Sequence, residues 1–359
     1  MFGGVMMDSS PLCRLSLIVS AGVALIAAAG FAHRAPGDGT YQVQKVVKVG
    51  GDGGFDYVYA DSAGRKLYVA RGGQGARVDV FDLDTLASAG QIAKTSAHGA
   101  ATDAKTHHGF ASSKPVAMWD TKTLEPVKTI EVDGGPDGIL NDDFNHRTYV
   151  FSHRAPNTTV IDDADGTVLG TIDLGGAPEQ AASDGKGHIY VDLEDKDSVA
   201  VVDAKTMKVT NTYSLNGKGG TCAGLALDAR NHVLFVACRN PQVMVMLDAN
   251  DGKYLADLPI GRGTDGAGFN PRTGEAFSSQ GDGTLTIIKE TSPTTFEVEQ
   301  NLKTMPGAKT MTIDAKTGRI LLIAAEYAAP TTPAPEGQGN RPRRGPMVPG
   351  SFSVIVVGK

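Results

Sequence analysis

The sequence predicts an all-β chain that folds as a seven-bladed β-propeller of four-stranded antiparallel blades, closed by an N-terminal strand that completes the last blade. Two observations carry this prediction: a strand–turn–strand unit recurs seven times, and the two ends of the repeat region supply complementary strands. One four-stranded sheet cannot bury both of its faces, whereas repeated sheets placed round an axis cover one another and leave no open end.

The first element of each unit is an apolar strand that ends in an Asp or Asn turn and is followed by a second strand. An Asx side chain can hydrogen-bond the backbone two residues further on, which suits it to a tight turn. These turns recur at intervals of 40 to 44 residues. The turn residues are Asp61, Asp103, Asp143, Asp184, Asp228, Asn270 and Asp314.

A third strand of alternating β-branched and aromatic residues follows each pair, as in VDVFDLDTL and VAMWDTKTL, and a short fourth strand follows in turn, as in PVKTIEV. The last unit has only three strands and finishes with FSVIVVGK. The segment YQVQKVVKVG at residues 41–50 precedes the first unit. We therefore expect this segment to be the fourth strand of the last blade.

The predicted domain organisation is an export signal at residues 1–32 and a single propeller domain at residues 41–359. Arg14 precedes an apolar run from Leu15 to Ala29, and small residues follow, which is typical of a cleaved signal peptide. The run is shorter than the ~20 residues that a spanning helix needs. A periplasmic or secreted protein with no stable membrane span is expected. Residues 330–350 are rich in Pro and Gly and predict a disordered loop insertion in the last blade.

The repeats resemble the YVTN-repeat (YncE-like) β-propeller family of exported bacterial proteins, a WD-like repeat class. The resemblance rests on GGPDG at 134–138, GGAPEQ at 175–180 and the paired strands KGHIYVDL and SVAVVDAKT. It extends over residues 41–359, but HHGFASS in the second unit and the insertion in the last unit depart from the pattern. The resemblance implies a binding or scaffold protein, although one fold serves many functions.

Antiparallel strand order predicts a polar site at one mouth of the central channel. The first strand of each blade begins on the face where the second strand ends, so residues from both positions meet there. His153 and Arg239 follow from second strands, and Arg71, Arg154, Glu194, Asp282 and Glu326 are further candidates on this face. The residues expected nearest the axis are Asp56, His98, Asp137, Glu179, Cys222, Asp265 and Lys309. Such a site fits a protein or small-molecule ligand; alternatively, these polar groups only solvate the strand ends.

A divalent metal ion is the most specific form of this hypothesis. His98, Asp137 and Glu179 come from three consecutive blades, and mixed imidazole and carboxylate ligands suit several divalent ions.

The cysteines leave two alternatives open. Cys222 and Cys238 lie opposite each other in a hairpin that is symmetric about Arg230. They form either a disulfide, as an oxidising compartment favours, or two small reduced strand residues.

The composition separates the candidate functions. The formal net charge of −6 and the pI of about 5.8 give no positive field to attract a phosphate backbone, so DNA binding is unfavoured even though the resembled family includes reported DNA binders. A monomeric binding or scaffold protein is the first expectation. The alternatives are a lactonase-like hydrolase, by analogy of fold alone, and a metal- or quinone-dependent oxidoreductase.

Overall fold

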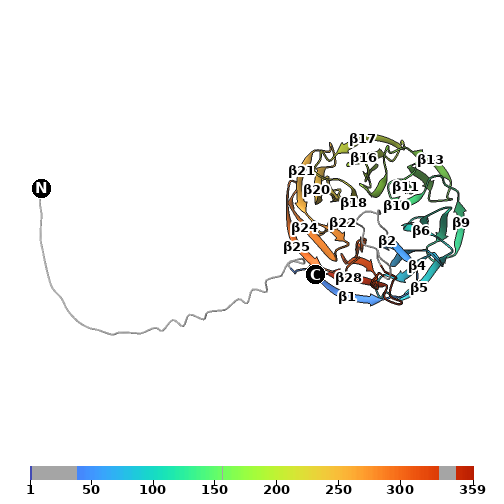
Figure 1. Cartoon of the computed structure of the whole chain (residues 1–359). Coiled ribbons are helices and arrows are strands. Elements are labelled where there is room, and N and C mark those ends of the chain that lie inside the picture. The colour runs from blue at the N-terminus through green and yellow to red at the C-terminus, as the bar shows by residue number, and fades with distance from the viewer. Residues whose placement is uncertain (2–38, 156, 331–344) are drawn as a thin grey trace, which may run out of the picture. The chain divides into compact units, whose positions relative to one another are not determined.

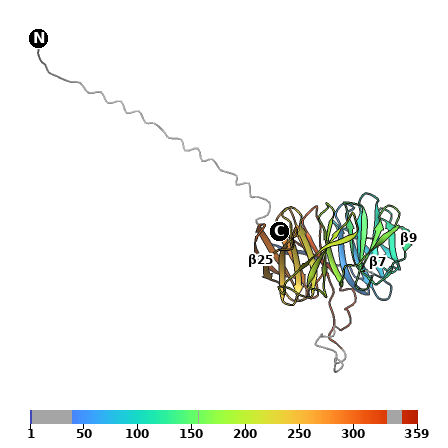
Figure 2. The same cartoon turned by 90° about the horizontal axis from the view of Figure 1, so that it is seen from above.

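Seven four-stranded antiparallel sheets surround a common axis, as Figure 1 shows along that axis and Figure 2 from the side. The computed structural model describes residues 1, 39–155, 157–330 and 345–359. The predicted fold class is confirmed. Apart from Met1, the predicted export signal lies outside the described residues, as do residues 331–344 of the predicted insertion. Within the described ranges no helix has the length and hydropathy needed to cross a membrane.

Each blade runs from an innermost strand at the axis to an outermost strand at the rim. The innermost strands of blades 1 to 7 are β2 (Gly54–Asp61), β6 (Ala97–Asp103), β10 (Pro136–Asp142), β14 (Pro178–Ser183), β18 (Cys222–Asp228), β22 (Thr264–Asn270) and β26 (Met311–Ile313). The second strands are β3 (Lys66–Gly72), β7 (His108–Ser113), β11 (Arg147–Ser152), β15 (His188–Leu193), β19 (Val233–Arg239), β23 (Glu275–Gln280) and β27 (Ile320–Ala324).

The outer half of each blade is built the same way. The third strands are β4 (Arg77–Asp82), β8 (Val116–Asp120), β12 (Thr158–Asp162), β16 (Ser198–Asp203), β20 (Gln242–Asp248), β24 (Thr284–Ser292) and β28 (Ser353–Gly358). The outermost strands are β5 (Ser88–Ala93), β9 (Pro126–Ile130), β13 (Val168–Ile172), β17 (Lys208–Ser214), β21 (Tyr254–Pro259), β25 (Thr295–Lys303) and β1 (Gln42–Lys48).

The ring closes as the sequence predicts, because β1 pairs with β28 and completes blade 7. Tyr41, immediately before β1, also ties this blade to blade 6. Its hydroxyl donates a hydrogen bond of 2.5 Å to the buried Glu275 of β23, and its ring meets that of Phe277 edge-on at 5.3 Å. Lys359, next to β28, places its Nζ 2.6 Å from the same carboxylate. Both ends of the propeller domain thus bind one buried acid.

Blade 2 shows how a departure from the apolar repeat is accommodated. Its second strand, β7, has the sequence HGFASS, yet it is a regular strand with five consecutive buried residues. Trp119 on the neighbouring strand β8 is fully buried, and a Cβ added at Gly109 would lie 2.3 Å from its Cε2 atom. The small residues of β7 therefore leave room for the largest side chain of the core.

The turns and the cysteines follow the local chemistry. The carboxylate of Asp228 accepts a hydrogen bond from the backbone N–H of Arg230, two residues further on, at 2.9 Å, which is the predicted use of an Asx side chain. Cys222 and Cys238 lie directly opposite each other in the β18–β19 pair and form a disulfide. Of the two alternatives for this pair, the structure contains the bridge.

Candidate functional site

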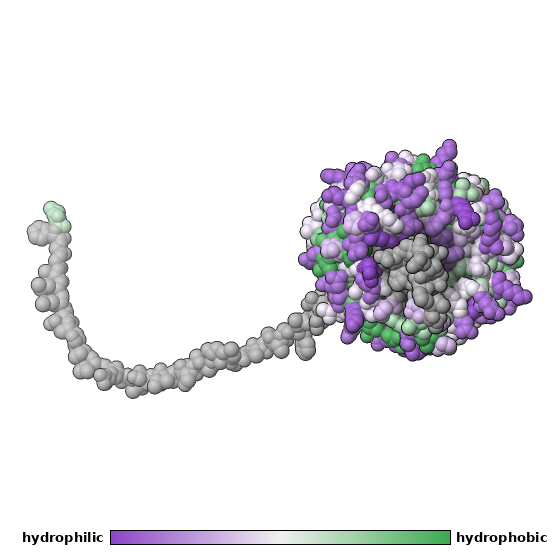
Figure 3. All heavy atoms as spheres, viewed as in Figure 1, coloured by the Kyte–Doolittle hydropathy of each residue, from purple (hydrophilic) through white to green (hydrophobic). Residues whose placement is uncertain are grey.

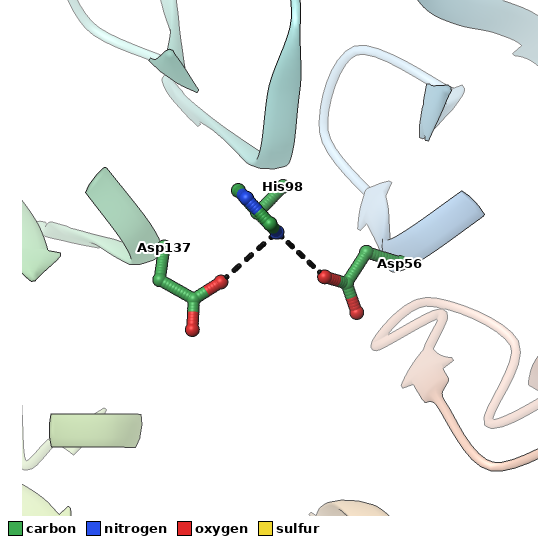
Figure 4. A group of neighbouring side chains, drawn as sticks. All are labelled: Asp56, His98 and Asp137. Atoms are coloured by element: carbon green, nitrogen blue, oxygen red, sulfur yellow. Dashed lines mark hydrogen bonds and ion pairs between the residues drawn. The ribbon is translucent and has the colours of Figure 1, made fainter. Parts of the chain in front are cut away.

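Irregular register at the start of the innermost strands positions the candidate side chains. In blades 1 to 4 the pairing of the first two strands shifts there, leaving Asp56, His98, Asp137 and Glu179 within the shifts. A bulge re-aims a side chain relative to the regular pleat. The side chains of Asp56, His98 and Asp137 accordingly point toward one another across the mouth of the channel (Figure 4).

Five of these side chains form a connected group that we call the mouth cluster: Asp56, His98, Asp137, His153 and Glu179. Nδ1 of His98 lies 2.7 Å from Oδ2 of Asp56 and 3.1 Å from Oδ1 of Asp137. Nε2 of His153, just beyond β11, lies 3.2 Å from Oδ2 of Asp137 and 3.6 Å from Oε1 of Glu179. Asp137 is therefore the centre of the mouth cluster, with one imidazole at each of its oxygens.

The mouth cluster concentrates negative charge in a partly dry environment. The hydrogen bond with Asp56 raises the pKa of His98. Burial raises the pKa of Asp137, an effect that the neighbouring imidazoles oppose. Burial also raises the pKa of Glu179 to about 9, and the charge of Asp137 adds to this shift. A positive ion placed among these carboxylates would offset the repulsion between their negative charges.

The opposite half of the mouth is already neutralised by ion pairs. Arg239 pairs with Asp265 and, at 2.5 Å, with Glu194, and Lys309 also pairs with Asp265. The two halves therefore differ in chemistry: one holds cationic side chains that match its acids, and the other holds three carboxylates and two histidines. Hydrophilic side chains cover much of the face seen along the axis (Figure 3).

A cavity of about 500 Å³ runs along the axis and is lined by residues of β2, β6, β10, β14, β22 and β26. Two side chains cross it near the mouth. The Tyr57 hydroxyl of blade 1 donates to Oε2 of Glu179 in blade 4 at 3.0 Å. Gln180 of blade 4 accepts from the backbone N–H of Ala267 in blade 6 at 3.0 Å and donates to its carbonyl at 3.1 Å. These hydrogen bonds across the channel hold Glu179 and the adjacent Gln180 in position.

The structure brings together most of the residues predicted at the mouth and separates a few. The register puts Ala223, rather than Cys222, at the shift in blade 5. Asp282 accepts from the Arg262 backbone, and Glu326 pairs with Lys48. Arg71 is fully buried, with its guanidinium over the ring of Phe352 and bonded to the backbone carbonyls of residues 50–53, so it offers no exposed cation at the mouth.

The predicted metal set of His98, Asp137 and Glu179 divides between two groups of potential ligands. One group is Asp56, His98 and Asp137, and the other is Asp137, His153 and Glu179. Within each group the ligand atoms lie within 4.8 Å of one another. The shared member is Asp137, which sequence order alone places in the middle blade of the three.

Two residues at the site were missed in the sequence. Tyr57 reaches Glu179 only because the ring brings blades 1 and 4 face to face, and nothing in its local sequence indicates this. Asp192 of β15 is fully buried, and its Oδ1 accepts from the backbone N–H of Gln180 at 2.6 Å. The signal for Asp192 was an acid inside the apolar strand HIYVDL.

Comparison with known proteins supports the fold and leaves the function open. No protein-family model matches the chain, and no curated protein matches it. Among solved structures, a chain from the crystal structure of a mitotic checkpoint complex aligns over 87% of this chain and 95% of its own, with a TM-score of 0.66 and 12% sequence identity. At that identity the likeness concerns architecture alone, so a function can be inferred only from the residues of the site.

Proposed function

We propose that the protein is an exported binding propeller of the YVTN-repeat kind whose channel mouth binds a divalent cation and, through it, a small polar ligand. The mouth cluster is the observation that carries the proposal: three carboxylates and two imidazoles from blades 1 to 4 converge at Asp137. Imidazole and carboxylate together are ligands for zinc, manganese and similar ions. The apolar run after Arg14 supports export and a periplasmic or secreted location.

Solvent access supports binding rather than a purely structural role. The side chains of His98 and His153 are 54% and 40% exposed, so an ion can reach them from the mouth. If these acids served only to solvate strand ends, the other half of the mouth would have the same excess of carboxylates, whereas Arg239 and Lys309 neutralise it.

Calorimetric titration of metal-free protein with Zn²⁺, Mn²⁺, Ca²⁺ and Cu²⁺ tests the proposal. We expect at least one of these ions to bind, and Asp137→Asn to weaken binding at least 100-fold while the thermal unfolding transition is retained. His188→Ala is the matched control, because His188 and Asp184 form a similar 2.8 Å pair that belongs to neither mouth group. Absence of binding by all four ions to folded protein would refute the proposal.

A metal-dependent hydrolase is a second candidate, favoured by the exposed edge of the mouth cluster. A cation held there by three protein ligands would keep positions open for water, and a metal ion lowers the pKa of bound water to near neutrality. Turnover of a panel of lactones and phosphate esters by cation-loaded protein, absent from Asp137→Asn, would select this candidate over a binding protein. No turnover would leave the protein as a binder.

A further inference from the structure

We propose that the channel mouth holds two divalent cations bridged by the carboxylate of Asp137, and that this pair binds an oxyanion such as phosphate or a carboxylate. The proposal rests on the proposed function and adds the number of ions, the role of each ligand and the class of the bound molecule. It follows from the way the mouth cluster divides between the two oxygens of one side chain.

Each oxygen of Asp137 faces a different set of ligands. Oδ1 lies beside Nδ1 of His98, which also contacts Asp56. Oδ2 lies beside Nε2 of His153, which also contacts Glu179. The two halves are thus equivalent in composition, each with one imidazole nitrogen, one carboxylate of its own and one oxygen of the shared carboxylate.

The distances fit two ions. Two ligand atoms bound to one ion through bonds of ~2.2 Å lie at most ~4.4 Å apart. The imidazole-to-carboxylate distances in the mouth cluster run from 2.7 to 3.6 Å, within that limit in both halves. A carboxylate that gives one oxygen to each ion is the arrangement of two-metal sites, whose ions lie ~3.5–4 Å apart. All three ligand atoms of each half lie within 4.8 Å of one another, close to that limit.

The charges favour a pair of ions and then an anion. Asp56, Asp137 and Glu179 contribute three negative charges when ionised. One divalent ion leaves a net charge of −1, whereas two ions give +1. A centre of net positive charge attracts an oxyanion. The remaining coordination positions of both ions face the solvent at the exposed edges of His98 and His153, so such an anion can span them.

Asp192 adds an independent observation. It lies opposite Glu179 at the register shift between β14 and β15, and its side chain is fully buried. Its Oδ2 has no hydrogen-bond partner among the described residues. Burial raises the pKa of Asp192 and keeps the group neutral, so it adds no negative charge to the mouth cluster, but a buried polar oxygen without a partner is still costly. A cation at the mouth would attract the partial negative charge of this oxygen and offset that cost.

The number of bound ions tests the two-cation centre directly. We expect titration and elemental analysis with Zn²⁺ or Mn²⁺ to give two ions per chain, His98→Ala and His153→Ala each to give one, and Asp137→Asn to reduce affinity for both at least 100-fold. His188→Ala, the matched control, should retain two. In Mn²⁺-loaded protein, an electron paramagnetic resonance spectrum of exchange-coupled ions would report the shared carboxylate.

The alternative outcomes separate the two proposals. One ion per chain, lost completely in both His98→Ala and His153→Ala, would overturn the two-cation centre and leave the proposed function standing. No bound ion in folded protein would overturn both. Titration of inorganic phosphate then tests the ligand class: we expect binding to protein loaded with two ions and none to metal-free protein. Equal phosphate binding with and without the ions would refute the anion-binding role.

Discussion

Replacing Tyr41 by alanine should destabilise the whole propeller, because this residue joins the closing strand of blade 7 to blade 6. Its side chain is 4% exposed, and its backbone N–H and C=O both bond the amide of Gln300 in β25, at 2.9 and 2.8 Å. Removing a buried aromatic side chain costs about 3–5 kcal/mol. Tyr41→Phe removes only the hydroxyl bond to Glu275, and because Lys359 still pairs with that acid, we expect about 1.5 kcal/mol.

Urea unfolding followed by the fluorescence of Trp119 measures this effect. Trp119 is the only tryptophan and lies in blade 2, outside blades 6 and 7 that Tyr41 joins, so it reports loss of the whole ring. Val46→Ala is the control, since Val46 is on the same strand β1 but 52% exposed, and we expect a change below about 0.5 kcal/mol. If Tyr41→Ala also changed stability by less than about 1 kcal/mol, the closing strand would not hold the ring together and the reasoning would fail.

Two further predictions concern sites away from the mouth. Burial raises the pKa of Glu290 to about 7, so its contribution to stability is complete below pH ~4.5 and is lost as the pH rises through ~7. We therefore expect the unfolding free energy of the native protein to fall by on the order of 3 kcal/mol between pH 5 and pH 8. Glu290→Gln should remove this fall. A pH dependence unchanged by the substitution would contradict the assignment. The Cys222–Cys238 disulfide closes a loop with a sequence separation of 16, so replacing both cysteines by alanine should cost about 3 kcal/mol in urea unfolding. Two free thiols in the unfolded, unreduced protein would rule the bridge out.

The fold could be predicted from sequence because its signals are local and repeated. Six of the seven predicted Asx side chains, such as that of Asp228, accept a hydrogen bond from the backbone two or three residues further on, whereas in blade 3 Asp142 does so in place of the predicted Asp143. Seven copies of the turn make the repeat recognisable in spite of this irregularity. The HGFASS strand of blade 2 shows the limit of this approach. Its apolar pattern is broken, and only packing against Trp119 explains why Gly109 is required.

The candidate site could be predicted in outline, because antiparallel order alone assigns strand starts and ends to a face. Strand order therefore places Asp137, Glu179 and His153 at the mouth. The register shifts depend on hydrogen bonding between β-strands, which strand order does not specify, and they decide which residue turns toward the axis. For the same reason, Cys222 was placed at the mouth where the structure has Ala223.

The sequence by itself determined the number of blades, the closure by the strand after Tyr41 and the face on which the polar residues gather, since each depends on short-range patterns read in chain order. The tertiary structure alone decided which of those residues touch. Asp137 meets two histidines, Tyr57 reaches Glu179 across the channel, and Arg239 neutralises Asp265 because the curvature of the ring sets these distances. Curvature arises from the packing of neighbouring sheets and is encoded in no single repeat.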